Sequence, residues 1–299
     1  MYKRQLLAQE KVAAPSAAPK QRTFASAEAA VEALVTASEA YDVPALKEIL
    51  GPDGTDLVVS EDEVLDRKLA KEFAAKAREK LVAVPDPKKK GRATFTFGPD
   101  DWPMAIPVVK EKAGWRFDTA AGKHEVLVRR IGRNELDAIE ICRGYVEAQH
   151  EYASRRHDGA RVNQYAQKIV STPGQRNGLA WKAADGTWKG PVGEGVAKAI
   201  AEGYHDKMEP YHGYTFKVLK GQGPSAPLGE MDFVVQGAMI GGFALVAAPV
   251  DYGKTGIKTF TVSHDGVVYE KDLGKKTREI FKSMERFDPG KGWTPVPED

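Results

Sequence analysis

Residues 134–155, NELDAIEICRGYVEAQHEYASR, decide how the rest of this sequence is interpreted. Asn134 is a strong N-cap residue, and Glu135 and Asp137 follow it in a first turn whose helix dipole favours acids. Apolar side chains then recur at helical spacing in two stripes, which comprise Leu136, Ile139, Cys142 and Val146, and Ala138, Ile141, Tyr145, Ala148 and Tyr152. We therefore expect a helix from Asn134 to about Arg155 that packs on both sides, between two halves of the protein.

The residues before this stretch predict three helices. The expected helices are residues 26–41, the short segment between Pro44 and Gly51, and residues 61–81. Ser26 is the expected N-cap of the first helix, because it precedes an Ala- and Glu-rich run. Ser60 followed by Glu63 matches a capping box at the start of the third helix.

A small antiparallel sheet is expected after these helices. Short apolar runs separated by Gly, Pro or Asp are typical of strands, and they occupy residues 93–97, 106–109, 115–117 and 126–128. Helices followed by such strands predict an α+β domain over residues 24–130, with the helices packed on a curved antiparallel sheet. Residues 1–23 are rich in Ala, Pro and Lys and are expected to form a flexible tether.

The second half of the sequence changes to strand periodicity. The expected strands are residues 211–218, 231–235, 242–249, 257–263 and 267–269. An Asp265-Gly266 hairpin turn joins the last two of them. We therefore expect a second domain over residues 131–274, in which the long helix packs on an antiparallel meander. Short helices are expected near residues 160–170 and 193–203, and a basic helix with an extension over residues 275–299.

Composition narrows the classes of function. The chain of 299 residues has 44 basic and 42 acidic residues, and the resulting net charge of +2 gives no reason to expect nucleic-acid binding. Its one cysteine, Cys142, excludes an internal disulfide and a Cys-x-x-Cys site, and we expect it to be a small buried apolar residue. No apolar window is long enough for a transmembrane helix. We expect no metal and no cofactor, because Glu147, His150 and Glu151 share a helix face without a second His or Cys.

Three arginines form the best candidate for an anion site. Arg129, Arg130 and Arg133 directly precede the expected helix start, where guanidinium groups and free N–H groups both favour a carboxylate or phosphate. Ion pairs with acids nearby in the sequence, such as Glu125, would satisfy the same arginines without any ligand.

A second candidate is the His- and Tyr-rich turn that contains His212 and Tyr214. These side chains suit a carbohydrate or peptide ligand, and packing at the rim of a hairpin would explain them equally well. The segment Gly253-Lys254-Thr255 resembles the end of a phosphate-binding loop, but the required earlier glycine is Ala248 and a strand follows, so we interpret it as a hairpin loop. Local spacing brings no nucleophile next to a base, and no catalytic residue is predicted.

Several motifs along the chain resemble those of DUF2950, a bacterial family of unknown function. The resemblance covers nearly the whole sequence and rests on residues 115–122, Glu125, 129–135, 148–152, 165–166, 171–174, 178–181, 212–214, 241–246, 252–256 and 269–274. Residues 134–272 are similar, more loosely, to pilin-like and pseudopilin-like modules, although the apolar amino-terminal pilin helix is missing.

The resemblance implies a location, but it carries no catalytic residue onto this chain. Proteins of the family are typically exported, and residues 6–9 are the only segment that could be a trimmed signal peptide. We therefore expect a non-enzymatic, exported protein of the periplasm or cell envelope that binds a partner protein or an envelope ligand. The alternative is an envelope hydrolase that acts on cell-wall or polysaccharide material with His212, Tyr214 or the arginine cluster.

Overall fold

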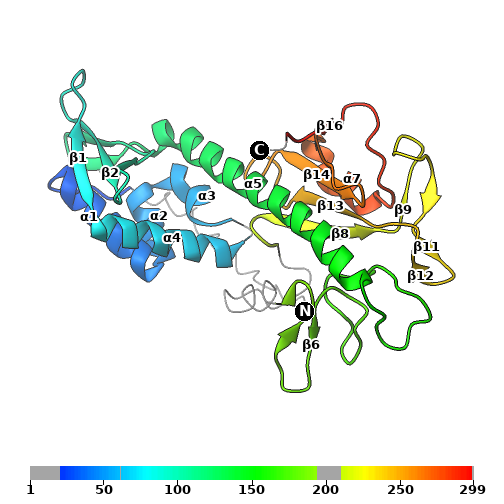
Figure 1. Ribbon diagram of the computed structural model, residues 1–299. Coiled ribbons are helices and arrows are strands. Elements are labelled where there is room, and N and C mark those ends of the chain that lie inside the picture. The colour runs from blue at the N-terminus through cyan, green and yellow to red at the C-terminus, as the bar shows by residue number, and fades with distance from the viewer. Residues whose placement is uncertain (1–20, 61, 194–209, 298–299) are drawn as a thin grey trace, which may run out of the picture.

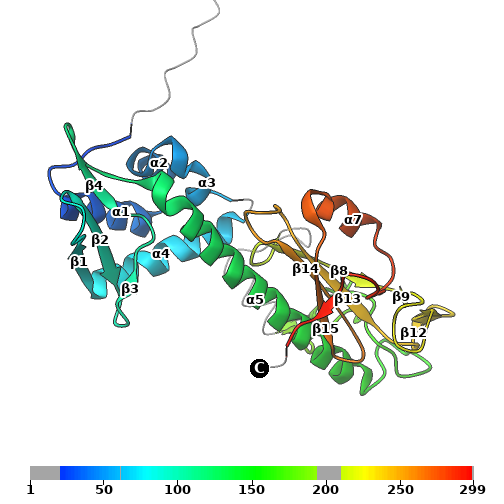
Figure 2. The same ribbon diagram turned by 90° about the horizontal axis from the view of Figure 1, so that it is seen from above.

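The computed structural model describes residues 21–60, 62–193 and 210–297 (Figure 1). It confirms the expected α+β class, since helices and antiparallel sheets surround two separate hydrophobic cores. The buried residues of the first core lie between Ala27 and Phe117, and those of the second between Ala138 and Phe287. We call the elements around them the N-terminal lobe and the C-terminal lobe. A single long helix, α5 (Thr119–Ala153), extends from one lobe into the other (Figure 2).

The N-terminal lobe begins with helices that follow their local signals. These are α1 (Ala27–Ala40), α2 (Val43–Leu50), the 3-10 turn η1 (Pro52–Gly54), α3 (Thr55–Val58) and α4 (Glu63–Glu79). The Ser26 hydroxyl accepts a hydrogen bond from the N–H of Ala29, which confirms the predicted cap of α1. The predicted cap of α4 is wrong by two residues: Asp62 accepts from the N–H of Leu65, while Ser60 accepts from the N–H of Asp62.

A five-stranded antiparallel sheet completes this lobe. Its strands are β1 (Leu81–Pro85), β2 (Arg92–Phe97), β3 (Trp102–Pro103), β4 (Val108–Glu111) and β5 (Gly114–Phe117), in the order β1-β2-β4-β5 with β3 beside β2. Ala93 and Phe95 are buried, as the alternation predicted. Strand β1 was not predicted, because no glycine separates it from α4, which ends where Lys80 adopts an extended conformation.

Helix α5 begins fifteen residues earlier than predicted, at Thr119 instead of Asn134. The expected strand over residues 126–128 is therefore wrong, and these residues belong to the helix. The segment from Thr119 to Arg133 contains no proline, and eight of its fifteen residues are Ala, Leu, Lys, Glu or Arg, which favour a helix over a turn. Gly122 lets the helix approach the segment between β3 and β4, since a Cβ there would lie 2.6 Å from the Cα of Ile106. The domain boundary between residues 130 and 131 stays a prediction, and it falls inside this helix.

The C-terminal lobe packs α5 against a second five-stranded sheet. Its order is β16 (Thr294–Pro295), β15 (Val268–Asp272), β14 (Lys258–Ser263), β13 (Ala244–Pro249) and β8 (Tyr214–Leu219), all antiparallel. Every residue of β13 is buried, as its continuous apolar sequence predicted. The predicted burial of Cys142 is confirmed as well, since it is 0% exposed in this core.

Shorter elements surround this sheet. They are β6 (Trp181–Lys182), β7 (Trp188–Lys189), β9 (Gly221–Gln222), β10 (Met231–Asp232), β11 (Val234–Val235), β12 (Ala238–Met239), the 3-10 turn η2 (Gly274–Lys276) and α7 (Thr277–Ser283). The expected helix near residues 160–170 is wrong: the Gln149 side chain donates to the carbonyl of Ala166 and accepts from its N–H, which holds this segment as a loop. The helix expected over residues 193–203 lies almost wholly outside the described residues.

Candidate functional site

The predicted anion site loses its helix N-terminus, because Arg129, Arg130 and Arg133 lie well inside α5. Backbone N–H groups at these positions belong to the helix and do not point at a ligand. The Arg129 guanidinium donates to Glu125 Oε1 at 2.7 Å and to the carbonyl oxygen of Pro103 at 2.7 Å. Arg129 is therefore bonded within its own chain, which was the alternative to a ligand site.

Arg130 is held by the same lobe, and Arg133 is exposed. Arg130 donates to the carbonyl oxygens of Asp56 at 3.0 Å and Leu57 at 2.8 Å, at the end of α3. These bonds differ from those of Arg129, so the two guanidinium groups do not converge on one point. The Arg133 side chain is exposed on the helix surface.

Tyr214 is part of the C-terminal core, so it cannot contact a ligand in this conformation. The residue is 0% exposed, and its hydroxyl donates to the carbonyl of Lys258 at 2.8 Å. A Cβ at Gly256 would lie 2.3 Å from the Tyr214 hydroxyl, so only glycine leaves room for this ring. Burial raises the pKa of Tyr214, which keeps the phenol neutral.

His212 pairs with a carboxylate on α5. Its Nδ1 lies 2.7 Å from Asp137 Oδ2, and its ring stacks on that of Tyr211 with the centroids 4.3 Å apart. The other ring nitrogen, Nε2, is buried and makes no hydrogen bond with any residue that the structure describes. A histidine oriented by a carboxylate is the arrangement of a general base, but a base must reach its substrate, and this Nε2 is enclosed.

The His212 pair belongs to a larger polar contact between the lobes. Asp62, the N-cap of α4, accepts a hydrogen bond from the N–H of Gly213 at 3.1 Å. Asn134 donates to the carbonyl of Thr255 at 2.9 Å, while its own Oδ1 is buried without a partner among the described residues. We call Asp62, Asn134, Glu135, Asp137, His212 and Gly213 the interlobe junction.

Glu135 connects the junction to the C-terminal sheet. One carboxylate oxygen, Oε1, accepts from the N–H groups of Ile257 and Lys258, both at 2.9 Å. These bonds fix α5 against the first residue of β14. Asn134, predicted to cap the helix, and Glu135, predicted to lie in its first turn, instead form long-range bonds with the C-terminal lobe.

Buried charge lies on the N-terminal side of the junction. Asp66 is 8% exposed, and its pKa is raised, chiefly by burial. A hydrogen bond from Ser60 and the charge of Arg130 oppose this rise, and the charge of Asp62 adds to it. Arg130, singled out in the sequence as a ligand residue, thus favours the charged form of a buried acid of its own chain, Asp66. Sequence reasoning missed Asp62 and Asp66 as members of this site, because Gly213 lies about 150 positions away and no local pattern connects them.

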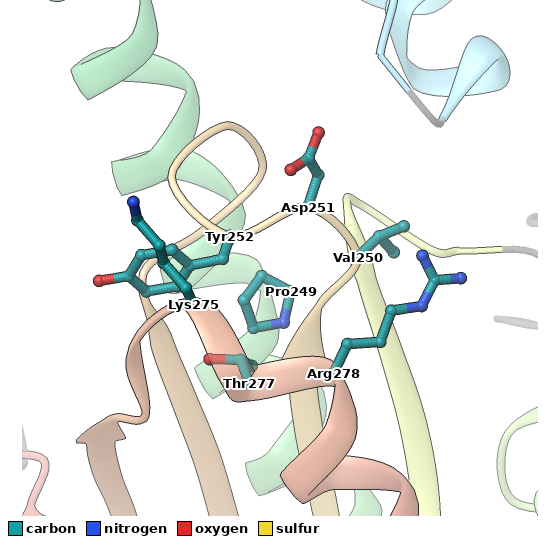
Figure 3. Close-up of a pocket in the computed structure, with 7 residues that line it drawn as sticks. All are labelled: Pro249, Val250, Asp251, Tyr252, Lys275, Thr277 and Arg278. Carbon is teal, nitrogen blue, oxygen red and sulfur yellow. The ribbon is translucent and has the colours of Figure 1, made fainter.

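A pocket lies on the C-terminal lobe, beside the loop that carries Thr255. Its volume is about 370 Å³, and it is lined by Pro249, Val250, Asp251, Tyr252, Lys275, Thr277 and Arg278 (Figure 3). The last residue of β13 and the loop after it provide four of these residues, and η2 with the start of α7 provides the other three. Lys275 and Arg278 are both exposed, so two cations face solvent at this pocket.

The chain's own bonds fix the loop side of the pocket. Asp251 Oδ2 forms an ion pair with Lys254 at 2.7 Å, and the backbone of Asp251 bonds with Thr255. Tyr252 donates its hydroxyl to Asp272 at 3.2 Å, which orients its half-buried ring. The segment 251–255 is therefore a tight loop, as predicted, and not the start of a helix.

The described residues contain neither a metal-binding cluster nor a membrane-spanning helix. No group of three or more His, Cys, Asp or Glu side chains in the described ranges could hold a metal ion. Among the helices that the structure describes, none is both long enough and apolar enough to cross a bilayer.

Fold and site together define a two-core α+β protein with an interlobe junction and one described pocket. The chain belongs to the DUF2950 family of proteins of unknown function, whose sequence profile matches residues 21–296. No curated protein and no solved structure matches the chain, and the similarity to pilin-like modules is not confirmed.

Proposed function

We propose that this chain is an exported, non-enzymatic protein of the cell envelope that binds an acidic envelope ligand in the pocket. Export and the periplasmic location rest on the family resemblance. The observation that supports ligand binding is the charge of the pocket: Lys275 and Arg278 face solvent, whereas the acid Asp251 is already paired with Lys254. Exposed cations at the rim of a pocket favour an anionic ligand.

The lining of the pocket favours a sugar acid. Tyr252 presents an aromatic ring held by Asp272, and rings of this kind stack on the apolar face of a sugar while cations bind its carboxylates. Of the seven lining residues only Asp251 carries a carboxylate, whereas glycoside hydrolysis normally needs two. The pocket therefore supports binding better than cleavage.

Binding can be tested with two trisaccharides that differ in their carboxylates. Calorimetry should detect trigalacturonic acid and no binding of neutral maltotriose. Lys275→Glu should weaken the affinity about tenfold or more, the loss expected when a charged hydrogen bond is removed. Lys89→Glu changes the net charge equally, on an exposed loop of the other lobe, and should leave the affinity unchanged. Equal binding of both sugars, or equal loss in both variants, contradicts the proposal.

The alternative function is hydrolysis of an envelope polysaccharide, and the His212–Asp137 pair is the observation that favours it. A hydrolase would release new reducing ends from polygalacturonate, and His212→Ala would abolish the release. Such turnover would replace our proposal with the alternative.

Export has its own experiment. The native full-length gene product should fractionate with the cell envelope or periplasm, and mass spectrometry should show a processed amino terminus. An unprocessed product in the cytosol would contradict the proposed location without affecting the binding test.

A further inference from the structure

The two edges of the N-terminal sheet differ in whether another segment of the chain pairs with them. At one edge, β5 is covered by the chain itself: the N–H of Phe24 donates to the carbonyl of Trp115, and the N–H of Trp115 donates to that of Phe24, both at 2.8 Å. At the other edge, β1 pairs with β2 and lies at the periphery of the molecule in both views (Figures 1 and 2). Among the described residues, β1 has no neighbouring strand on its outer side.

The ladder with β2 determines which backbone groups of β1 point outward. The N–H of Gly98 donates to Lys80, and the N–H of Asp86 donates to Arg92, so the even-numbered residues of the strand bond toward β2. The N–H and C=O groups of Leu81 and Ala83 therefore point away from the sheet. The carbonyl of Pro85 does so as well, and proline has no N–H to leave unpaired.

One face of this edge has an unusual order of side chains. Val82 and Val84 are each 42% exposed, although both are β-branched and apolar. Because side chains alternate along a strand, Lys80 and Asp86 flank them on the same face. The order along the strand is thus cation, apolar, apolar, anion, and the two charged residues also form ion pairs within the chain, Lys80 with Asp101 at 2.7 Å and Asp86 with Arg92 at 3.7 Å.

That order is complementary to itself in the antiparallel direction. When two copies of β1 pair about Ala83, Val82 lies opposite the partner's Val84, and Lys80 lies opposite the partner's Asp86. Ala83 faces the partner's Ala83 as a hydrogen-bonded pair, and the N–H of Leu81 meets the partner's Pro85 carbonyl. No donor is lost at Pro85, since only its carbonyl is used.

We propose that the outer edge of β1 is a docking surface for a second copy of this chain, joined in the register that centres on Ala83. The contact is isologous, so the same surface closes a two-fold dimer and occupies the outer edge of β1 in both copies. A strand of five residues buries less surface area than about 1,200 Å², the low end of the range for stable complexes. The dimer therefore dissociates on dilution.

The register can be tested by cysteine crosslinking. The chain provides a clean background, because its one cysteine, Cys142, is 0% exposed and burial raises the pKa of its thiol to about 12. In this register Val82 lies opposite the partner's Val84 at a non-hydrogen-bonded position, where the Cα atoms are about 4.5 Å apart. Two copies of Val82 are diagonal neighbours, about 7–8 Å apart, beyond the usual reach of a disulfide.

An equimolar mixture of Val82→Cys and Val84→Cys chains should therefore form disulfide dimers about tenfold faster than either variant alone. Leu136→Cys, 66% exposed on α5, measures the collision rate of a surface thiol. If the mixture crosslinks no faster than Leu136→Cys, the proposal of a docking surface is overturned. Equal rates for the mixture and the single variants overturn the register.

A second variant tests the backbone contact. Ala83→Pro removes an N–H that points outward and leaves the ladder with β2 intact, and proline is tolerated on edge strands. Sedimentation velocity over a wide concentration range should show a dimer for the unmodified chain and a monomer for Ala83→Pro. A chain that stays monomeric throughout, or an Ala83→Pro variant that dimerises as before, overturns the proposal.

Discussion

Asp62 is expected to hold the two lobes together, and the substitution Asp62→Asn isolates that role. Asparagine keeps an oxygen that can cap α4 by accepting from Leu65, but it replaces the second oxygen with an NH₂ group that faces the N–H of Gly213. Asp62 is 3% exposed, so the Gly213 donor is left buried without an acceptor. Such a loss costs about 1–3 kcal/mol, and we expect this decrease in the free energy of unfolding.

Asp42→Asn is the matched control. Asp42 caps α2 by accepting from the N–H of Ala45 at 3.1 Å, but it is exposed. Asn and Asp cap helices about equally well, so this variant should unfold with nearly unchanged free energy in urea. Hydrogen exchange measured by mass spectrometry should be faster at Gly213 in Asp62→Asn alone. The reasoning is refuted if the two variants unfold within about 0.5 kcal/mol of each other.

Two further predictions concern the same region. Gly213→Ala should destabilise the fold more than Gly253→Ala in thermal denaturation. Both glycines have positive φ, but a Cβ at Gly213 would lie 2.5 Å from Asn134 Nδ2, whereas a Cβ at Gly253 would meet no atom within 4 Å. Asp66, whose pKa is raised by burial, binds its proton more tightly in the folded state than in the unfolded state. The protonated form therefore contributes most to stability below the ordinary pKa of 3.8, and this contribution is lost as the pH rises through the raised pKa. Urea unfolding between pH 7 and 4 should show the unmodified chain gaining stability relative to Asp66→Asn, and parallel pH curves would contradict this.

Local signals in the sequence predicted most helices and strands, but they did not predict where each element begins and ends. Ser26 and the alternating Ala93 and Phe95 identified α1 and β2, because capping and alternation depend on neighbours in the chain. The start of α5 was misplaced because Asn134 has the features of an N-cap, yet its side chain bonds to Thr255 in the other lobe. A capping residue in mid-helix can only be recognised once its distant partner is known.

The candidate site was predictable only in part, for the same physical reason. His212 and Arg130 were singled out, and both lie at or beside the interlobe junction. Their partners Asp137 and Asp66 were not, because these contacts connect residues far apart in the sequence. Tyr214 is fully buried, and its hydroxyl is satisfied within the core by the carbonyl of Lys258 on β14.

The proposed dimer and the proposed ligand site use different lobes, and this separation has a consequence for how they work together. Strand β1 lies at the end of the N-terminal lobe, whereas the pocket lies between the β13 loop and α7 in the C-terminal lobe (Figure 1). A dimer joined through β1 therefore leaves both pockets accessible. Two weak sites on one particle bind a polymer more tightly than either site alone, provided that the polymer spans both. A trisaccharide reports the pocket alone and crosslinking reports the edge alone, so the two proposals can fail independently, while a long acidic polysaccharide responds to both.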